Sequence, residues 1–163
     1  MAFFSYTPAQ FFQKLVRAYD AFSRQPSEDG LMDVVLVLYH LREWLNPTEN
    51  VGQEMAEIKA KAPGQRTDEE ALFLAVGELS EFRIVRGLCN HAKHFELSKP
   101  IDHRMQIVPR FRTGLSRAGD SLGVINFTVG GVEVRSVIQP VYTKYFDYFQ
   151  AKQPGLVKEA LKR

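Results

Sequence analysis

The sequence predicts a mainly α-helical single domain, in which a small antiparallel β-hairpin or sheet is inserted before the C-terminal helices. Apolar residues recur every three or four positions over residues 7–97 and again over 139–163, which is typical of amphipathic helices. Between them, residues 104–138 alternate in polarity or are rich in branched side chains, which is typical of strands. All 163 residues are therefore treated as one domain, made of a helical bundle, a β insertion and C-terminal helices.

The first helices are marked by the residues at their ends. Thr7 is a candidate N-cap, with Pro8 at the first helical position. A second helix begins after Ser27 and ends at Leu45, because the Asn-Pro pair that follows does not continue a helix. Apolar residues surround most of this second helix, so we expect it to be buried on most sides. Residues 48–62 predict a shorter, polar helix that faces solvent.

We expect one long helix from Thr67 to about Phe95, with Pro100 as the limit of anything helical. Thr67 and Glu70 have the spacing of a capping box, in which each side chain bonds the other residue's backbone N–H. When this helix is turned by about 100° per residue, its apolar side changes faces near Phe82. A basic and polar stripe then continues where the apolar stripe stops.

The polar stripe consists of Arg83, Arg86, Asn90, Lys93 and His94. It is either the solvated side of a helix that leaves the bundle, or the lining of a groove or subunit interface that binds an anion. Two or three like charges on one face repel each other, and an incoming phosphate would relieve that repulsion and accept hydrogen bonds from Arg, Asn and Lys. For His94 the alternative role is to bond the last free carbonyls of the helix.

Three segments predict strands: MQIVPRF (105–111), LGVINFTV (122–129) and VEVRSVI (132–138). The Gly130-Gly131 pair joins the last two as a tight hairpin. Pro109 cannot donate a backbone hydrogen bond, so we expect the first segment to be an edge strand or an irregular one. The chain is then helical again to its end, in two helices.

Composition places the protein among ordinary globular chains, with 45% hydrophobic and 25% charged residues. The single cysteine, Cys89, excludes a disulfide within the chain and fits a reducing compartment. The N-terminal sequence MAFFSYTPAQFF has no positively charged region before its apolar residues, which is unlike a signal peptide. The longest apolar run, residues 34–41, is far shorter than a membrane span. We therefore expect a cytoplasmic protein that does not cross a membrane.

The net charge of +2 hides an uneven distribution. Residues 1–82 carry 7 Lys and Arg against 13 Asp and Glu, a net charge of −6. Residues 83–117 carry 8 against 2, a net charge of +6, and also contain three histidines. Such a basic segment suggests an anionic partner, with RNA among the candidates, or a segment that pairs with the acidic half inside the fold. Both interpretations remain open.

The long helix resembles the signature of the HEPN superfamily, a group of small helical domains that includes metal-independent endoribonuclease toxins and RNA-processing factors. The signature, Arg-Asn-x-x-x-His with a variable second position, lies near the C-terminal end of a long helix. Asn90 and His94 supply its Asn-x-x-x-His part, while its Arg position falls on Cys89. Arg86 lies one turn earlier on the same face, and Arg86-x-x-x-x-His91 fits a looser spacing.

The resemblance implies a HEPN-like bundle over about residues 8–97 and 139–150, a homodimer, and catalytic roles for His94, Asn90 and Arg86. In that mechanism His94 takes the ribose 2′-proton, the freed oxygen attacks the adjacent phosphate, Arg86 stabilises the added charge, and Asn90 orients the imidazole. The remaining basic residues of the segment are the phosphate-binding candidates: Arg83, Lys93 and His91.

No cofactor and no metal site are expected, since His91 and His94 have no third ligand at a reliable spacing. His40, close to Glu43, predicts a hydrogen bond to a carboxylate in the core, with a site shared with His94 as the alternative. The leading hypothesis is a HEPN-like protein that binds RNA or another polyanion, with endoribonuclease activity of the toxin or defence type left open. The alternative is a non-catalytic helical interaction protein or accessory subunit that acts through a protein partner.

Overall fold

The computed structural model describes residues 6–93, 105–109 and 125–162. Its helices are α1 (Pro8–Arg24), α2 (Glu28–Leu45), α3 (Val51–Ala60), the 3-10 turn η1 (Pro63–Gln65), α4 (Asp68–Glu78), α5 (Ser80–Lys93), α6 (Val134–Lys152) and α7 (Leu156–Leu161). The strands β1 (Met105–Pro109), β2 (Ile125–Val129) and β3 (Val132–Glu133) form one antiparallel sheet in the order β1-β2-β3. The predicted fold class is confirmed: the chain is mainly α, with a small sheet before the C-terminal helices.

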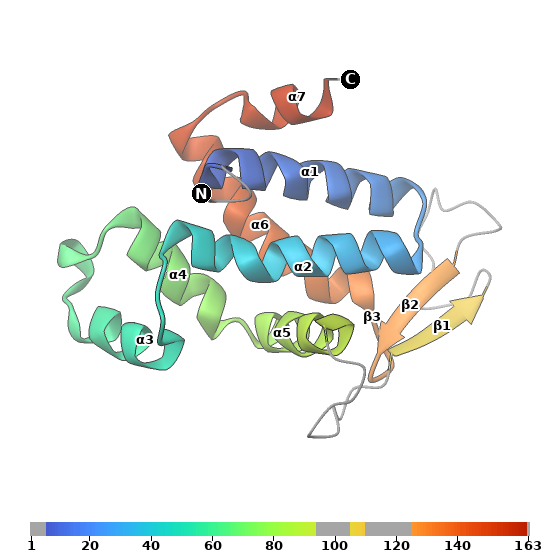
Figure 1. Cartoon of the computed structure of the whole chain (residues 1–163), viewed down its shortest axis with the longest axis horizontal. Helices are drawn as coiled ribbons and strands as arrows, with labels where there is room; N and C mark the ends of the chain where they lie inside the picture. Colours follow the sequence, from blue (N-terminus) through green and yellow to red (C-terminus); the bar gives the residue numbers. More distant parts are fainter. Residues whose placement is uncertain (1–5, 94–104, 110–124, 163) are drawn as a thin grey trace.

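Helix α2 is the centre of the bundle (Figure 1). It contacts α1, α4, α5 and α6, and α7 lies on the outer side of α1. The sheet covers one end of the bundle, and α3 and α4 extend from the other. Seven residues of α2 are buried, in agreement with the burial on most sides that its sequence predicts. The fully buried Tyr145 of α6 donates a hydrogen bond from its hydroxyl to the Leu38 carbonyl, 3.1 Å away, which ties α6 to this centre.

The predicted helix starts are confirmed by their caps. Thr7 and Gln10 form a capping box, as do Thr67 and Glu70. The Ser27 hydroxyl accepts a hydrogen bond from the Gly30 N–H at 3.0 Å. Each of these side chains satisfies a backbone N–H that has no partner within its own helix.

The single long helix predicted from Thr67 to Phe95 is wrong, because the helix is interrupted at Leu79. Leu79 has φ −63° and ψ 129°, an extended conformation that ends α4, and α5 begins at the next residue. This break resets the rotation of the helix. Buried residues before it and after it therefore belong to the same core: Leu72, Val76, Phe82, Val85, Leu88 and Cys89. The change of faces near Phe82 in a continuous helix is thus the consequence of the break.

The strand predicted over residues 132–138 is also wrong beyond Glu133, since Val134 already belongs to α6. The branched residues from position 134 to 141 are spaced for one side of a helix, and all four are buried: Val134, Val137, Ile138 and Val141. Glu133 caps α6 by accepting a hydrogen bond from the Arg135 N–H at 3.2 Å. Helical spacing and a cap therefore outweigh both β propensity and the lost hydrogen bond of Pro140 inside the helix.

Helices α3 and α4 enclose a second, smaller core of Ile58, Phe73 and Leu74. Ile58 is the one buried residue of α3, which agrees with the polar, solvent-facing helix predicted there. The side chain of Arg42, only 6% exposed, connects this small core to α2. Its Nε donates a hydrogen bond to the Phe73 carbonyl at 3.1 Å. Its guanidinium carbon lies 3.8 Å from the centre of the Phe73 ring and 5.3 Å from that of Phe82, within the range of cation–π attraction.

Glycine at position 77 makes room for this guanidinium. A Cβ at Gly77 would lie 2.5 Å from Nη2 and 2.9 Å from Cζ of Arg42, closer than van der Waals contact allows. Replacing a mid-helix glycine by alanine ordinarily favours the helix. At this position the steric conflict with a buried side chain opposes that gain.

We expect Gly77→Ala to destabilise the fold by about 1–3 kcal/mol, because the added methyl group forces the buried Arg42 guanidinium off the Phe73 ring. Gly87→Ala in α5 is the matched control. A Cβ there meets nothing within 4 Å, so that variant gains about 0.5–1 kcal/mol from helix propensity. Urea denaturation of the three proteins measures both changes. Equal stability of Gly77→Ala and Gly87→Ala would contradict the packing described for Arg42.

Candidate functional site

The described part of the predicted polar stripe lies on the solvent side of α5. Arg83, Arg86 and Asn90 are exposed, and Cys89 is buried on the opposite, apolar side. Spacings of three and four residues bring the three polar side chains onto consecutive turns of one face. The structure therefore brings these three predicted site residues together. His94, and the side chains of His91 and Lys93, lie outside the described residues.

Positive charge on this face is not balanced nearby within α5. None of the ion pairs formed among the described residues involves Arg83 or Arg86. The acid of the first turn, Glu81, instead accepts a hydrogen bond from the Ser80 hydroxyl at 2.9 Å. Both guanidinium groups can therefore take an anionic oxygen without first breaking an ion pair to a described residue.

Arg86 also borders a partly open cavity of about 70 Å³ between α2, the start of α3, α4 and α5. The cavity is lined by Tyr39, Arg42, Glu43, Val51, Phe73, Phe82 and Arg86. Three of the lining residues are purely apolar, while two arginines, a tyrosine and a glutamate supply polar groups. The α2 residues of this set were not singled out by sequence as a site with Arg86, because they precede Arg86 by more than forty positions.

The charges around the cavity influence one another. Burial lowers the pKa of Arg42 from its ordinary value, and the like charge of Arg86 acts in the same direction. Burial, followed by the negative charge of Glu43, raises the pKa of the Tyr39 hydroxyl, which stays protonated at neutral pH and can donate a hydrogen bond. The cavity therefore combines two guanidinium groups and a hydroxyl donor with one carboxylate.

His40 forms the predicted hydrogen bond to a carboxylate, but outside the core. Its Nδ1 lies 2.7 Å from Oε2 of Glu43, and since a carboxylate only accepts, Nδ1 carries the shared proton. Both side chains are partly exposed. Glu43 also lines the cavity.

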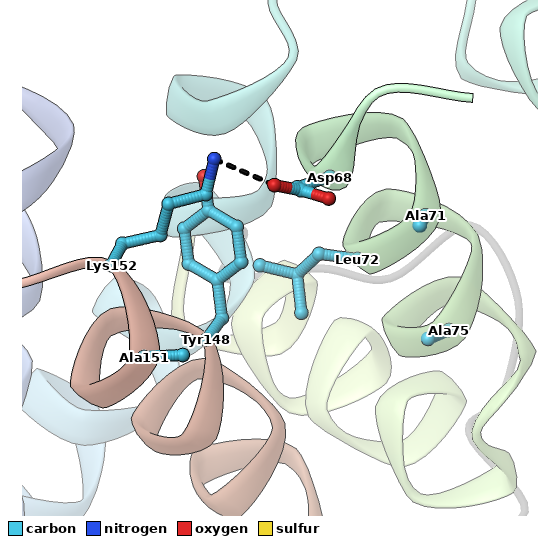
Figure 2. A pocket seen from close by; sticks show the side chains of 7 residues that line it. All are labelled: Asp68, Ala71, Leu72, Ala75, Tyr148, Ala151 and Lys152. Atoms are coloured by element: carbon cyan, nitrogen blue, oxygen red, sulfur yellow. Dashed lines mark ion pairs between the residues drawn. The ribbon is translucent and has the colours of Figure 1, made fainter. Parts of the chain in front are cut away.

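A larger groove, of about 530 Å³, runs between α4 and α6 (Figure 2). Its lining consists of small or apolar residues with an ion pair at the rim: Asp68, Ala71, Leu72, Ala75, Tyr148, Ala151 and Lys152. Nζ of Lys152 lies 2.7 Å from Oδ2 of Asp68, and the Tyr148 hydroxyl donates to Oε1 of Glu69 at 2.5 Å. The charged groups here are already paired with each other, so this groove offers no reactive group comparable to the α5 face.

No group of three or more His, Cys, Asp or Glu suited to a metal ion occurs among the residues that the structure describes. In the same part of the chain, no helix is both long and apolar enough to span a bilayer. No protein-family model, curated protein or solved structure matches this chain.

The Tyr148–Glu69 hydrogen bond predicts an acid-dependent contribution to stability. That bond, as the largest cause, holds the pKa of the Glu69 carboxyl below its usual range of about 4.3. A carboxyl whose pKa is lowered by folding stabilises the fold at pH values above its unfolded-state pKa. This contribution disappears as the pH falls through the folded-state pKa. Tyr148→Phe should therefore lose less stability than the wild type between about pH 5 and pH 3. Urea midpoints across this range test it, and parallel curves for the two proteins would contradict it.

Proposed function

We propose that this protein binds RNA through phosphate contacts made by the polar face of α5. The observation that supports the proposal is the row of exposed Arg83, Arg86 and Asn90 on consecutive turns, with no ion pair to either arginine among the described residues. The net charge of +6 over residues 83–117 gives an anionic chain a long-range attraction to this region.

The side chains of this face suit phosphate oxygens. Guanidinium groups present planar pairs of N–H donors that match two phosphate oxygens, and the Asn90 amide adds a neutral donor one turn further along. Each phosphate that binds also removes the repulsion between neighbouring arginines. Contacts of this kind position a nucleic acid without reading its sequence.

The resemblance to HEPN domains adds two further elements to the proposal. It assigns His94 the role of general base, with Asn90 and Arg86 beside it, in a metal-independent ribonuclease. It also assigns the protein a homodimeric state, which sedimentation velocity measures directly. Each element stands apart from RNA binding, because a face that holds phosphates needs neither catalysis nor a second subunit.

We expect RNA binding to weaken steeply with salt, and the double variant Arg83→Gln/Arg86→Gln to reduce that dependence. Each lost phosphate contact lowers the slope of log affinity against log salt by about 0.7 for a single strand, so the double change lowers it by about 1.4. Fluorescence anisotropy of a labelled single-stranded RNA between low and moderate salt measures both. Arg17→Gln, which removes one exposed charge on α1, is the control and should keep the wild-type slope. Absence of binding at low salt would contradict the proposal and favour the interaction-protein alternative.

Cleavage is tested separately, with total RNA and tRNA incubated with the protein in chelator. If the assigned mechanism operates, His94→Ala abolishes cleavage while binding measured by anisotropy persists, because the imidazole moves a proton and does not hold the strand. RNA that stays intact with both proteins would remove the catalytic element and leave binding as the function. Cleavage at equal rates by both would identify a contaminating nuclease.

A further inference from the structure

The cavity between α2, α4 and α5 contains an unsatisfied buried charge. Arg42 is 6% exposed, and its Nη2 has no hydrogen-bond partner among the described residues. Its Nε is bonded to the Phe73 carbonyl, so the guanidinium is held in place while part of its donor capacity stays unused. A buried donor without a partner costs more free energy than an average hydrogen bond returns. An anion in the cavity that Arg42 lines would balance its buried charge and so lower that cost.

The neighbours of Arg42 define the charge of such a ligand. Arg86 brings a second guanidinium to the cavity from α5, and the Tyr39 side chain adds a hydroxyl group from α2. Val51, Phe73 and Phe82 form apolar walls that keep bulk water from the charges, which strengthens their attraction for an anion. Two arginines against the single carboxylate of Glu43 leave the lining with a net positive charge.

Size limits the ligand to one small group. One water needs roughly 10–15 Å³ of cavity space, so the volume of about 70 Å³ suits a small group such as one compact oxyanion. A tetrahedral phosphate group with one oxygen directed outward, past Arg86 to solvent, is such a group.

Glu43 adds a criterion that separates two kinds of phosphate. Its Oε2 is bonded to His40, which leaves Oε1 as a further acceptor on a residue that lines the cavity. A phosphate diester, as in the interior of an RNA strand, has no P–O–H group and would meet this carboxylate as a repelling charge. A monoester has a second pKa of about 6, and its P–O–H group can donate a hydrogen bond to the carboxylate.

We propose that the cavity formed by Arg42, Arg86, Tyr39 and Glu43 binds one phosphate monoester group. Arg42 and Arg86 hold its oxygens, Tyr39 donates a hydrogen bond to one of them, and Glu43 accepts a hydrogen bond from the remaining P–O–H group. The group comes either from a small free phosphate or from the terminal phosphate of an RNA. The site shares Arg86 with the proposed RNA-binding face, but it does not require that face, because a single phosphate group fills it.

The test is a titration of the full chain with inorganic phosphate near pH 6, with ionic strength held constant by chloride and the heat followed by calorimetry. We expect saturable binding of one phosphate per chain, weakened about tenfold or more in Arg86→Gln, which changes an exposed residue and leaves the core intact. Arg83→Gln, three residues earlier on the exposed face and not in the cavity lining, is the matched control and should bind phosphate like the wild type. Arg42→Gln should also lose binding, with folding checked by circular dichroism.

Absence of saturable binding, or equal weakening in Arg83→Gln and Arg86→Gln, would overturn the proposal. The second result would show a diffuse charge effect instead of a site. Arg83→Gln separates this outcome from RNA binding, because it should weaken RNA binding and leave phosphate binding unchanged. Two RNA oligonucleotides that differ only in a 5′-phosphate or 5′-hydroxyl then distinguish the sources: tighter binding of the first identifies an RNA terminus, and equal binding identifies a small free phosphate.

Discussion

The arrangement of α4 and α5 around α2 depends on the buried guanidinium of Arg42. A charge removed from water must be compensated by its surroundings, and here the compensation comes from the Phe73 carbonyl and from two aromatic rings. The packing of Arg42 against α4 also requires a glycine at position 77. The extended conformation of Leu79 lets Phe82 reach Arg42 from the start of α5. One side chain thus fixes where the small α3–α4 core meets the main one.

Local signals in the sequence were sufficient for the starts of α1, α2 and α4, since Thr7, Ser27 and Thr67 cap in ways that involve only the next three residues. The break at Leu79 has no such signal, because no proline or glycine occupies that position. It follows from contacts between residues far apart in the chain, above all the one between Arg42 and the helix before the break. The segment after Gly131 has signals for both strand and helix, and packing of its branched residues on the core decided for the helix.

The candidate site divides in the same way. The exposed row of Arg83, Arg86 and Asn90 could be predicted because helical periodicity alone places these residues on one face. The cavity could not, since its α2 and α5 residues meet only in the folded chain. The available hint was local: charged residues at positions 42 and 43 inside the most apolar helix need a reason, and burial against another element is one.

A purely structural role does not account for all of Arg42. Replacing buried charged groups by apolar side chains of similar volume is often neutral or stabilising, so the aromatic contacts alone do not favour a guanidinium at this position. Its Nη2 lacks a partner among the described residues, and the neighbouring Arg86 adds repulsion that folding must overcome. Both features oppose folding, and an anion between the two arginines would turn their repulsion into attraction. The positions of the two guanidinium groups, held by the fold, are thus the preorganisation from which a bound phosphate would gain.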